Sequence, residues 1–329
     1  MTELADVTTT AAGRVEMVHT ELVAAPARDV YELVADVTAW PHTFGPTVHV
    51  EVLESTPAWE HLRIWAFAHG TVRTWTSHRT LDPEALTVDF RQGRPAAPVR
   101  TMGGQWRLLP QDDGRTLVEL RHDFTAADVE AIDLIRRAVD VNSTAELAAL
   151  REAAEQGASR ADLVLEFADS VEIDGAADDV AGFLRDAALW PARLPHVARL
   201  DVTEDEPGVQ VMSMDTRSTD GSLHTTESVR VCLPDGGIVY KQTATPAVMA
   251  AHTGRWSITE VPARPGRVVA TSAHTVVLRP EEVAALLGTR DLVRARAMVR
   301  HALGTNSRTT LAHAKAFAEG RAATGRAAA

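Results

Sequence analysis

The hydrophobic and polar positions in the first half of the chain predict a strand, a helix, a series of strands and a long final helix. Side chains alternate along 18–23 as they do in a strand. Apolar residues then stand at i, i+3, i+4 and i+7 from Val30 to Val37, which places them on one stripe of a helix. Trp40-Pro41 is expected to end this helix.

From Thr47 to Phe124 the apolar positions recur with a period of two, and turn sequences such as 112–114 separate the runs. This pattern predicts about six further strands. Apolar residues then recur at helical spacing from Ala126 to Glu155. A long antiparallel sheet with one terminal helix must curl around that helix to hide one face. We therefore predict an α+β fold of the helix-grip type, with a ligand cavity between the concave face and the helix.

The second half of the chain repeats this order at an offset of about 150 positions. The matching pairs include Trp40-Pro41 with Trp190-Pro191, Ser77 with Ser228, Arg79 with Arg230, Trp106 with Trp256, and Asn142 with Asn306. The last pair has a larger offset, which places an insertion between Arg279 and Leu303. We therefore predict two homologous helix-grip domains, at 13–157 and 160–320. The small and polar residues of 1–12 and 322–329 are expected to be frayed.

One predicted strand carries a candidate site. Trp75, Ser77 and Arg79 lie at i, i+2 and i+4, so their side chains leave the same face. On a concave face, Arg79 would be a guanidinium in a partly dry pocket, where it needs a ligand or a carboxylate beside it. The alternative is a solvated sheet face with a surface arginine. Ser228 and Arg230 repeat the pair, which favours the pocket.

These residues, with Trp40-Pro41 after the first helix, Trp106 on a late strand and Asn142 in the final helix, resemble the pocket pattern of didomain bacterial type II polyketide aromatase/cyclases. That family has START/Bet v1-like helix-grip domains. The resemblance implies an enzyme that folds a poly-β-ketone carried by an acyl carrier protein. It would close the first ring by a regiospecific aldol reaction and remove water to aromatise it. The resemblance also implies other type II polyketide synthase enzymes as partners and no cofactor.

The resemblance gives catalytic roles to Arg79 and Ser77. Arg79 would donate hydrogen bonds to the enolate or to the attacked ketone, a role worth about 3–4 kcal/mol, and Ser77 would relay a proton. The residues expected to contact the substrate are Trp40, Phe44, Thr47, His49, Trp75, Arg91, Trp106 and Asn142. For Trp40, Trp106 and Asn142, the alternative is ordinary packing in the core or the helix.

His49 and Arg91 are included among the expected substrate contacts for separate reasons. Single-domain relatives often have a tyrosine where Thr47 stands, and His49 shares the face of Thr47 in a regular strand. Arg91, with Arg94 and Arg100, surrounds a proline-containing loop. This loop would form a basic rim for an acidic carrier protein, and the alternative is a solvated loop.

The second domain is expected to have a related pocket, formed by Ser228, Arg230, Trp190, Trp256 and Asn306. Leu194 stands where the first domain has Phe44. Thr226 likewise replaces Trp75, so this cavity should be less aromatic. We therefore expect the main chemistry in the first domain, with the second domain supporting it or handling a later step.

Composition narrows the possible functions. The chain of 329 residues has a net charge of −12 and no Lys/Arg-rich run, which argues against a nucleic-acid surface. Cys232 is the only cysteine, so an intrachain disulfide is excluded. The sequence has neither a signal peptide nor an apolar run of membrane length, and we expect a cytoplasmic protein. His122 and His274 occupy matching strands, without the neighbouring ligands that a metal site needs.

Two non-catalytic functions stay open at this point. A hydrophobic-ligand or lipid binding and transfer protein would use the same cavity without catalysis. An interaction domain would have a cavity filled by its own side chains. An enzyme would turn over its substrate and would lose this activity when Arg79 is substituted, whereas neither non-catalytic protein would show turnover.

Overall fold

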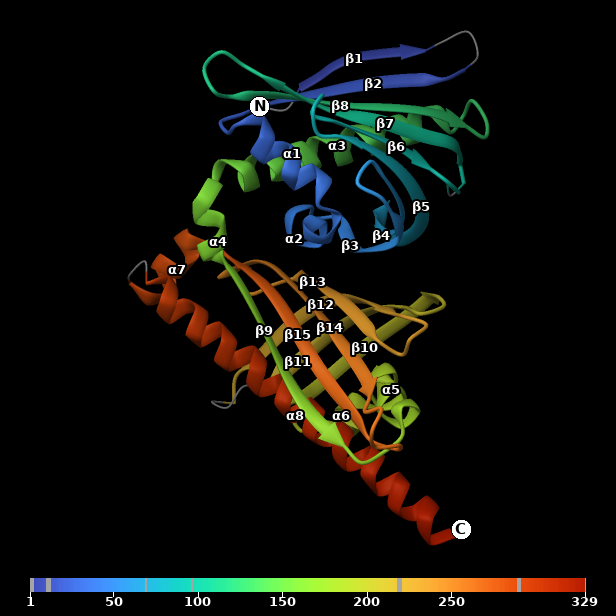
Figure 1. Cartoon of the computed structure of the whole chain (residues 1–329), viewed down its shortest axis with the longest axis vertical. Helices are drawn as coiled ribbons and strands as arrows, with labels where there is room; N and C mark the ends of the chain where they lie inside the picture. Colours follow the sequence, from blue (N-terminus) through green and yellow to red (C-terminus); the bar gives the residue numbers. More distant parts are fainter. Residues whose placement is uncertain are drawn as a thin grey trace. The chain divides into compact units, whose positions relative to one another are not determined.

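A computed structural model describes residues 3–9, 13–68, 70–95, 97–217, 221–288 and 291–328. The chain divides into two compact units, Met1–Arg160 and Ala161–Ala329. Each unit contains one antiparallel sheet and one long C-terminal helix (Figure 1). Among the described residues, no helix combines the length and the apolar character that crossing a membrane requires.

In the first unit, eight antiparallel strands follow the spatial order β1-β2-β8-β7-β6-β5-β4-β3. The strands are β1 (Glu3–Thr9), β2 (Val15–Val23), β3 (Thr47–Ser55), β4 (Trp59–Ala68), β5 (Thr71–Asp82), β6 (Thr87–Gln92), β7 (Val99–Pro110) and β8 (Thr116–Ala126). The helices are α1 (Ala27–Ala35), the 3-10 turn η1 (Val37–Ala39), α2 (Trp40–Thr43) and α3 (Ile132–Glu155). Figure 1 shows the sheet curling around these helices, which lie on its concave side.

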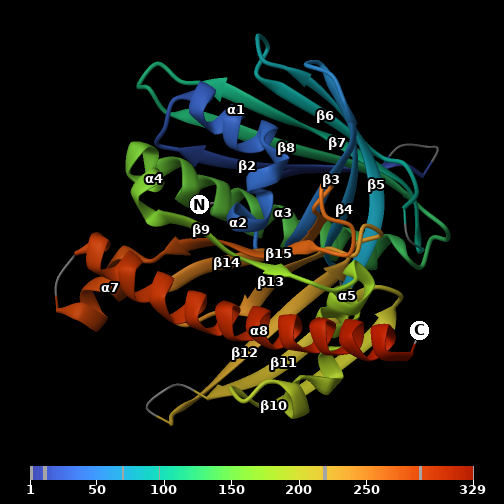
Figure 2. The same ribbon diagram turned by 60° about the horizontal axis from the view of Figure 1, so that its bottom comes forward.

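The second unit repeats this plan with seven strands in the order β10-β11-β12-β13-β14-β15-β9. The strands are β9 (Val164–Ile173), β10 (Val197–Glu206), β11 (Val209–Arg217), β12 (Leu223–Cys232), β13 (Ile238–Ala244), β14 (Met249–Glu260) and β15 (Val268–Leu278). The helices are α4 (Arg160–Leu163), which follows the 3-10 turn η2 (Gly157–Ser159), α5 (Ala177–Arg185), η3 (Ala187–Leu189), α6 (Trp190–Arg193), α7 (Pro280–Leu287) and α8 (Leu292–Ala328). Figure 2 shows α8 running along this sheet, and α7 occupies the predicted insertion.

The predicted fold class and order of elements are confirmed, and three local expectations are wrong. Residues 3–9 form β1, because an edge strand pairs through its backbone and needs no apolar side chains. The tail from Ala322 to Ala328 continues α8, since alanine favours a helix. Trp40-Pro41 begins α2, where the missing N–H of Pro41 costs nothing. The other terminal residues expected to fray, 1–2, 10–12 and 329, lie outside the described residues.

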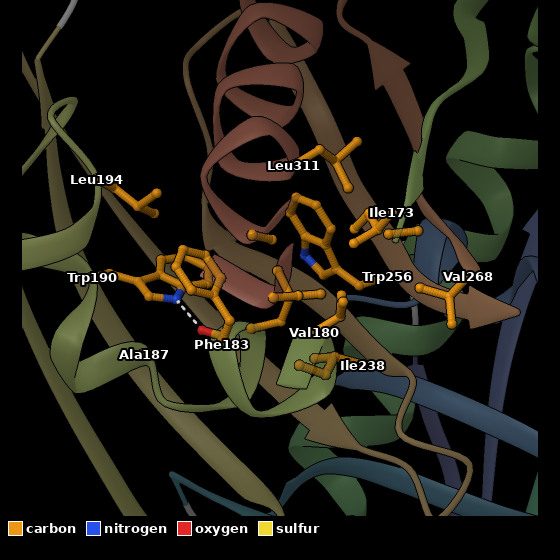
Figure 3. Packing of buried hydrophobic residues seen from close by; sticks show 14 of the residues in the cluster. Ile173, Val180, Phe183, Ala187, Trp190, Leu194, Ile238, Trp256, Val268 and Leu311 are labelled. Carbon is orange, nitrogen blue, oxygen red and sulfur yellow. Dashed lines mark hydrogen bonds between the residues drawn. The ribbon is translucent and has the colours of Figure 1, made fainter. Parts of the chain in front are cut away.

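Each unit has a core that fixes α1 or α5 against the sheet and the long helix. In the second unit, Val180 and Phe183 of α5 gather with Trp256 of β14 and Leu311 of α8 (Figure 3). The indole N–H of Trp190 donates to the Phe183 carbonyl at 3.2 Å. In the first unit, the indole of Trp40 makes the same kind of bond, to the Val34 carbonyl at 3.2 Å. The tryptophan of each Trp-Pro pair thus satisfies a carbonyl at the end of a helix.

Candidate functional site

A cavity of about 250 Å³ lies in the first unit, between the concave face of the sheet and α3. Its walls are largely apolar and aromatic. Trp40 meets Phe44 edge to face, with ring centroids 5.5 Å apart, and Phe44 stacks on Trp106 at 6.3 Å. Such aromatic contacts fix the position of each ring, so this part of the wall has a defined shape.

Most of the residues predicted from the sequence line this cavity. They are Trp40, Phe44, Thr47, Trp75, Ser77, Arg79, Trp106 and Asn142. The period of two along β5 therefore placed Trp75, Ser77 and Arg79 on the concave face. His49 and Arg91 are not among the lining residues.

The prediction that His49 shares the face of Thr47 is wrong, because a β-bulge lies between them. Thr47 is opposite Ala66 on β4, whereas His49 is opposite Trp65, the next residue along that strand. The extra residue on β3 turns the following side chains to the other face. His49 accordingly packs on the Trp65 ring, with centroids 5.4 Å apart.

Arg91 points away from the cavity, which corrects its prediction as a substrate contact. Its neighbours on β6, Phe90 and Gln92, line the cavity, so Arg91 belongs to the opposite face. Two hydrogen bonds join its guanidinium to the Asp123 carboxylate, at 2.6 and 3.1 Å. The side chain of Arg91 is half exposed and its charge is already paired.

Arg79 is buried at the end of the cavity next to α1, with 2% of its surface exposed. Its Nη1 and Nη2 donate to the carbonyl oxygens of Val34 and Ala35, at 3.2 and 2.8 Å. Its Nε lies 3.3 Å from Oε2 of Glu60, and its guanidinium lies 5.0 Å from the centroid of the Trp40 ring. Burial lowers the pKa of Arg79 to about 10, which leaves it charged at neutral pH.

The partners of Arg79 explain how a charge is tolerated at this depth. Glu60 is the carboxylate that the sequence argument required, and it lies directly across from Arg79 on β4. The carbonyls at the C-terminus of α1 also carry partial negative charge, which favours a cation. A guanidinium has five N–H donors. Val34 and Ala35 accept from two of them, whereas Nε lies at ion-pair distance from Glu60 and makes no hydrogen bond among the described residues.

Ser77 lies two residues before Arg79 on the same face and is also buried. Its hydroxyl is 3.4 Å from the Arg91 carbonyl, a long and therefore weak hydrogen bond. The Ser77 hydroxyl is therefore easily turned toward a ligand.

Two titratable residues of the cavity, Glu146 and His122, were not proposed from the sequence as site residues. Glu146 lies four positions after Asn142 on α3, so it continues the inward stripe of the helix. The surface it retains faces the cavity, and burial raises its pKa to about 7. Burial instead lowers the pKa of His122, on β8, to about 4, and its Nδ1 lies 3.3 Å from the Ser143 hydroxyl. Near neutral pH, His122 is uncharged and Glu146 is partly ionised.

The second unit has a smaller cavity of about 120 Å³. All of the residues predicted for it line it, namely Trp190, Ser228, Arg230, Trp256 and Asn306. Arg230 again lies over a tryptophan, 4.9 Å from the centroid of Trp190, and donates to the Leu184 carbonyl at 2.5 Å. Its cross-strand partner is the neutral Gln210, whose Oε1 accepts from Nη1 at 3.0 Å.

The described residues contain no group of three or more His, Cys, Asp or Glu side chains arranged to hold a metal ion.

Comparison with known proteins gives matches along most of the chain. The family model described as "Polyketide cyclase / dehydrase and lipid transport" matches residues 23–145. The actinorhodin polyketide synthase bifunctional cyclase/dehydratase of Streptomyces coelicolor is 44% identical over 317 residues, which cover 93% of this chain and 98% of that protein. The granaticin polyketide synthase bifunctional cyclase/dehydratase of Streptomyces violaceoruber is 43% identical, over 92% of this chain and 93% of that protein.

Two crystal structures are similar over both units. The di-domain ARO/CYC BexL from the BE-7585A biosynthetic pathway has a TM-score of 0.83 and 47% identity, and the match covers 92% of this chain and 98% of BexL. The di-domain ARO/CYC StfQ from the steffimycin biosynthetic pathway has a TM-score of 0.80 and 38% identity, over 93% of this chain and 99% of StfQ.

Proposed function

The chain belongs to the family of di-domain polyketide aromatase/cyclases, and from this premise we propose that its first unit closes the first ring of a poly-β-ketone by a regiospecific aldol reaction. The observation that carries the proposal is an aromatic cavity of about 250 Å³ that holds both Glu146 and His122. Their pKa values are shifted in opposite directions, to about 7 and about 4. Groups separated in this way are typical of acid–base sites.

Glu146 is the proposed general base. A methylene between two ketones is acidic, and an acid–base group is most efficient when its pKa lies near the working pH. The ionised Glu146 would take a proton from this carbon, and the resulting enolate carbon would attack a second ketone of the chain. The proton then returns to the oxygen of the new alcohol, so the ring closes without net proton exchange.

Ser77, Arg79 and His122 are the proposed donors to the substrate oxygens. The Ser77 hydroxyl and the N–H groups of Arg79 that Val34 and Ala35 do not use would hold the enolate oxygen where negative charge develops, which is the most effective place for a donor. The neutral His122 would donate to the attacked ketone. Trp75 and Trp106 would restrict the bound polyketide to one conformation, and this conformation determines which carbons are joined.

An acyl carrier protein is the proposed source of the substrate. Arg73 lines the cavity and is exposed, so it marks the opening. Arg94 is exposed on the connection between β6 and β7, which also contributes Pro98 to the lining, and Arg100 is exposed at the start of β7. Arginines suit an acidic protein and the phosphodiester of its prosthetic arm.

The test is a product assay with a reconstituted, carrier-bound poly-β-ketone. We expect Glu146→Gln to slow formation of the correct ring by about 10²–10⁴-fold, with loss of the rise in rate through about pH 7 that the wild type should show. Ser77→Ala should shift the products toward those of spontaneous cyclisation, whereas Ser228→Ala in the second unit should leave the ring pattern unchanged. Wild-type product ratios in both first-unit variants, with the polyketide still bound, would instead identify a ligand-binding or lipid-transfer protein.

A further inference from the structure

The second cavity contains a buried hydrogen-bond network centred on His274 of β15. The His274 Nδ1 lies 3.0 Å from the hydroxyl of Tyr240 and 3.0 Å from Nε2 of His252. On the other side of the ring, Nε2 lies 2.7 Å from the hydroxyl of Ser307 on α8. Tyr240, His252, His274 and Ser307 all line the cavity, so the network borders the space that a ligand would occupy.

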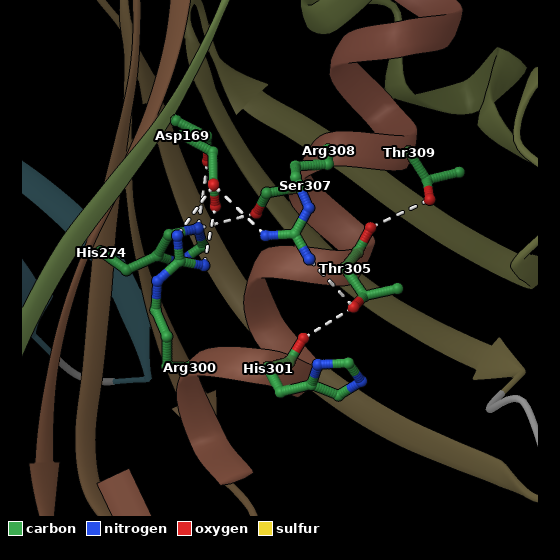
Figure 4. A network of polar contacts seen from close by, with 9 residues as sticks. Asp169, His274, Arg300, His301, Thr305, Ser307, Arg308 and Thr309 are labelled. Atoms are coloured by element: carbon green, nitrogen blue, oxygen red, sulfur yellow. Dashed lines mark hydrogen bonds and ion pairs between the residues drawn. The ribbon is translucent and has the colours of Figure 1, made fainter. Parts of the chain in front are cut away.

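His274 is held on both faces and at its edge. Its ring stacks between Phe167, at 4.7 Å, and His252, at 5.3 Å. Figure 4 shows Ser307 on α8 reaching His274, beside Asp169 with its arginine partners. Asp169 of β9 accepts hydrogen bonds from Arg300 at 2.8 and 3.0 Å, and a third from Arg308 of the same helix. These bonds fix α8 against β9, so the position of the imidazole is well defined.

The fold does not require this network. At the equivalent positions the first unit has Phe90 for Tyr240 and Met102 for His252, and the same strands pair in the same register. Apolar side chains therefore fill these places in the first unit. The third ring, His274, corresponds to His122 of the first unit. Burying the two additional polar rings of Tyr240 and His252 costs desolvation free energy, which points to a functional reason for their presence.

Four polar atoms around the second cavity lack a hydrogen-bond partner among the described residues. They are Nδ1 of His196, Nε of Arg230, Oε1 of Gln242 and Nδ1 of His252, and all four residues line the cavity. His252 is only 2% exposed. A buried polar atom without a partner costs about 1–3 kcal/mol. Such atoms are satisfied when a ligand with its own polar groups enters.

The size of the cavity limits that ligand to about one ring. An apolar cavity of about 150 Å³ is enough for benzene. The second cavity, at about 120 Å³, is therefore comparable with a single six-membered ring. The polar atoms around it suit a ring that carries a ketone and a hydroxyl group.

We infer that the second unit removes water from the six-membered β-hydroxyketone ring that an aldol closure produces, with His252 and Tyr240 as the catalytic residues. This inference rests on the proposed function of the first unit. In the step, His252 Nδ1 takes the proton from the carbon next to the ketone. The electrons of that C–H bond form a C=C bond, the C–O bond breaks, and the departing hydroxide takes the Tyr240 proton to give water.

His274 returns the proton to Tyr240. The imidazolium of His252 passes its Nε2 proton to Nδ1 of His274, which is also within hydrogen-bond distance of the Tyr240 oxygen. The proton thus moves from the carbon of the substrate to the released water through three side chains. Burial keeps the pKa of His252 near 3 and that of His274 near 4, so both rings are neutral at neutral pH and pass the proton on rather than hold it. Ser307 is the positioning residue that orients His274.

The experiment substitutes residues that the first unit already accommodates. Tyr240→Phe and His252→Met introduce the side chains of Phe90 and Met102, so folding should be preserved. With the carrier-bound poly-β-ketone, we expect both variants to close the ring at the wild-type rate. They should accumulate a product heavier by one water, with elimination slowed by about 10²–10⁴-fold. Mass spectrometry of the products over time gives both rates.

A second substrate makes the test independent of ring closure. A synthetic β-hydroxycyclohexanone should lose water on the wild-type chain and on Glu146→Gln, and appearance of the conjugated enone is followed by absorbance. Tyr240→Phe should lose this activity. Elimination at the wild-type rate in Tyr240→Phe and His252→Met would overturn the inference for the second unit. Failure of the proposed first-unit function would appear separately, as normal ring closure in Glu146→Gln.

Discussion

The two cavities share one end and differ in the rest of their walls. In each unit a buried arginine lies over the tryptophan of a Trp-Pro pair and donates to a carbonyl near the C-terminus of the preceding helix, α1 or α5. Away from this end, Trp75 of the first cavity is replaced by Thr226. His252 conversely replaces Met102, and the volume falls from about 250 to about 120 Å³.

This contrast teaches which part of the duplicated unit is scaffold and which part is variable. The arginine, the tryptophan and the helix end depend on one another, so changing one would leave buried polar groups unpaired. Wall positions such as Phe90 and Tyr240 face the cavity and tolerate exchange. A duplicated domain acquires a different chemistry at these positions without losing its fold.

The largest expected difference between the units concerns the partner of the buried arginine. Arg79→Met should destabilise the first unit by about 3 kcal/mol, because the partly buried Glu60, whose Oε2 is shielded from solvent, is left without its cation. Arg230→Met should cost the second unit about 1–3 kcal/mol, since Gln210 is neutral and also donates to Glu204 at 2.9 Å. Hydrogen–deuterium exchange of the intact chain measures the stability of each unit, because peptides from each unit report the protection of its own backbone amides.

A double variant provides the control. Glu60→Gln combined with Arg79→Met gives the first unit a neutral glutamine, as at Gln210 in the second unit. This double variant should regain much of the exchange protection that Arg79→Met loses. Equal losses in the two single arginine variants would mean that the charge of Glu60 does not distinguish the units.

Acidification should also change the stability of the two units to different extents. The pKa values of His252 and His274, about 3 and 4, lie below the ordinary value of 6.5. Their contribution to stability is therefore complete above pH 6.5 and is lost as the pH falls toward 4. In the first unit His122 behaves in the same way, but the raised pKa of Glu146 has the opposite sign, because its contribution grows as the pH falls below about 7.

We therefore expect the second unit to lose stability relative to the first by about 2–3 kcal/mol per pH unit just below pH 6.5. Exchange protection of the two units, compared at several pH values and corrected for the intrinsic exchange rate, gives this slope. His252→Met should roughly halve it. Parallel loss of protection in both units would show that the buried histidines do not control the response to acid.

The limits of prediction from sequence follow from the same residues. The period of two on β5 was enough to place Ser77 and Arg79 in the cavity, because β5 is regular there. It failed for His49, since the bulge in β3 leaves no mark in the apolar pattern. Glu60 was missed because strand register is needed to bring it opposite Arg79.

The position of Glu146 in the cavity could have been predicted from the sequence. It stands on the stripe of α3 that contains Val139 and Asn142, so the helical spacing alone directs it into the cavity. The network of the second unit has no such signal, because Tyr240, His252 and His274 come from three different strands. Only the order of those strands in the sheet brings them together.

A change in stability as small as that of Arg230→Met is expected from giving the second cavity the indole of the first. Thr226→Trp should cost about 1–3 kcal/mol through overpacking, and it should fill most of the 120 Å³. Loss of water from β-hydroxycyclohexanone should then stop, while the ring formed from the carrier-bound chain is unchanged. Thr226→Ser is the matched control, because it keeps the hydroxyl and the space. Full elimination activity in Thr226→Trp would place the ring elsewhere, and the difference between the two cavities would then lie in packing rather than in the molecule that each one holds.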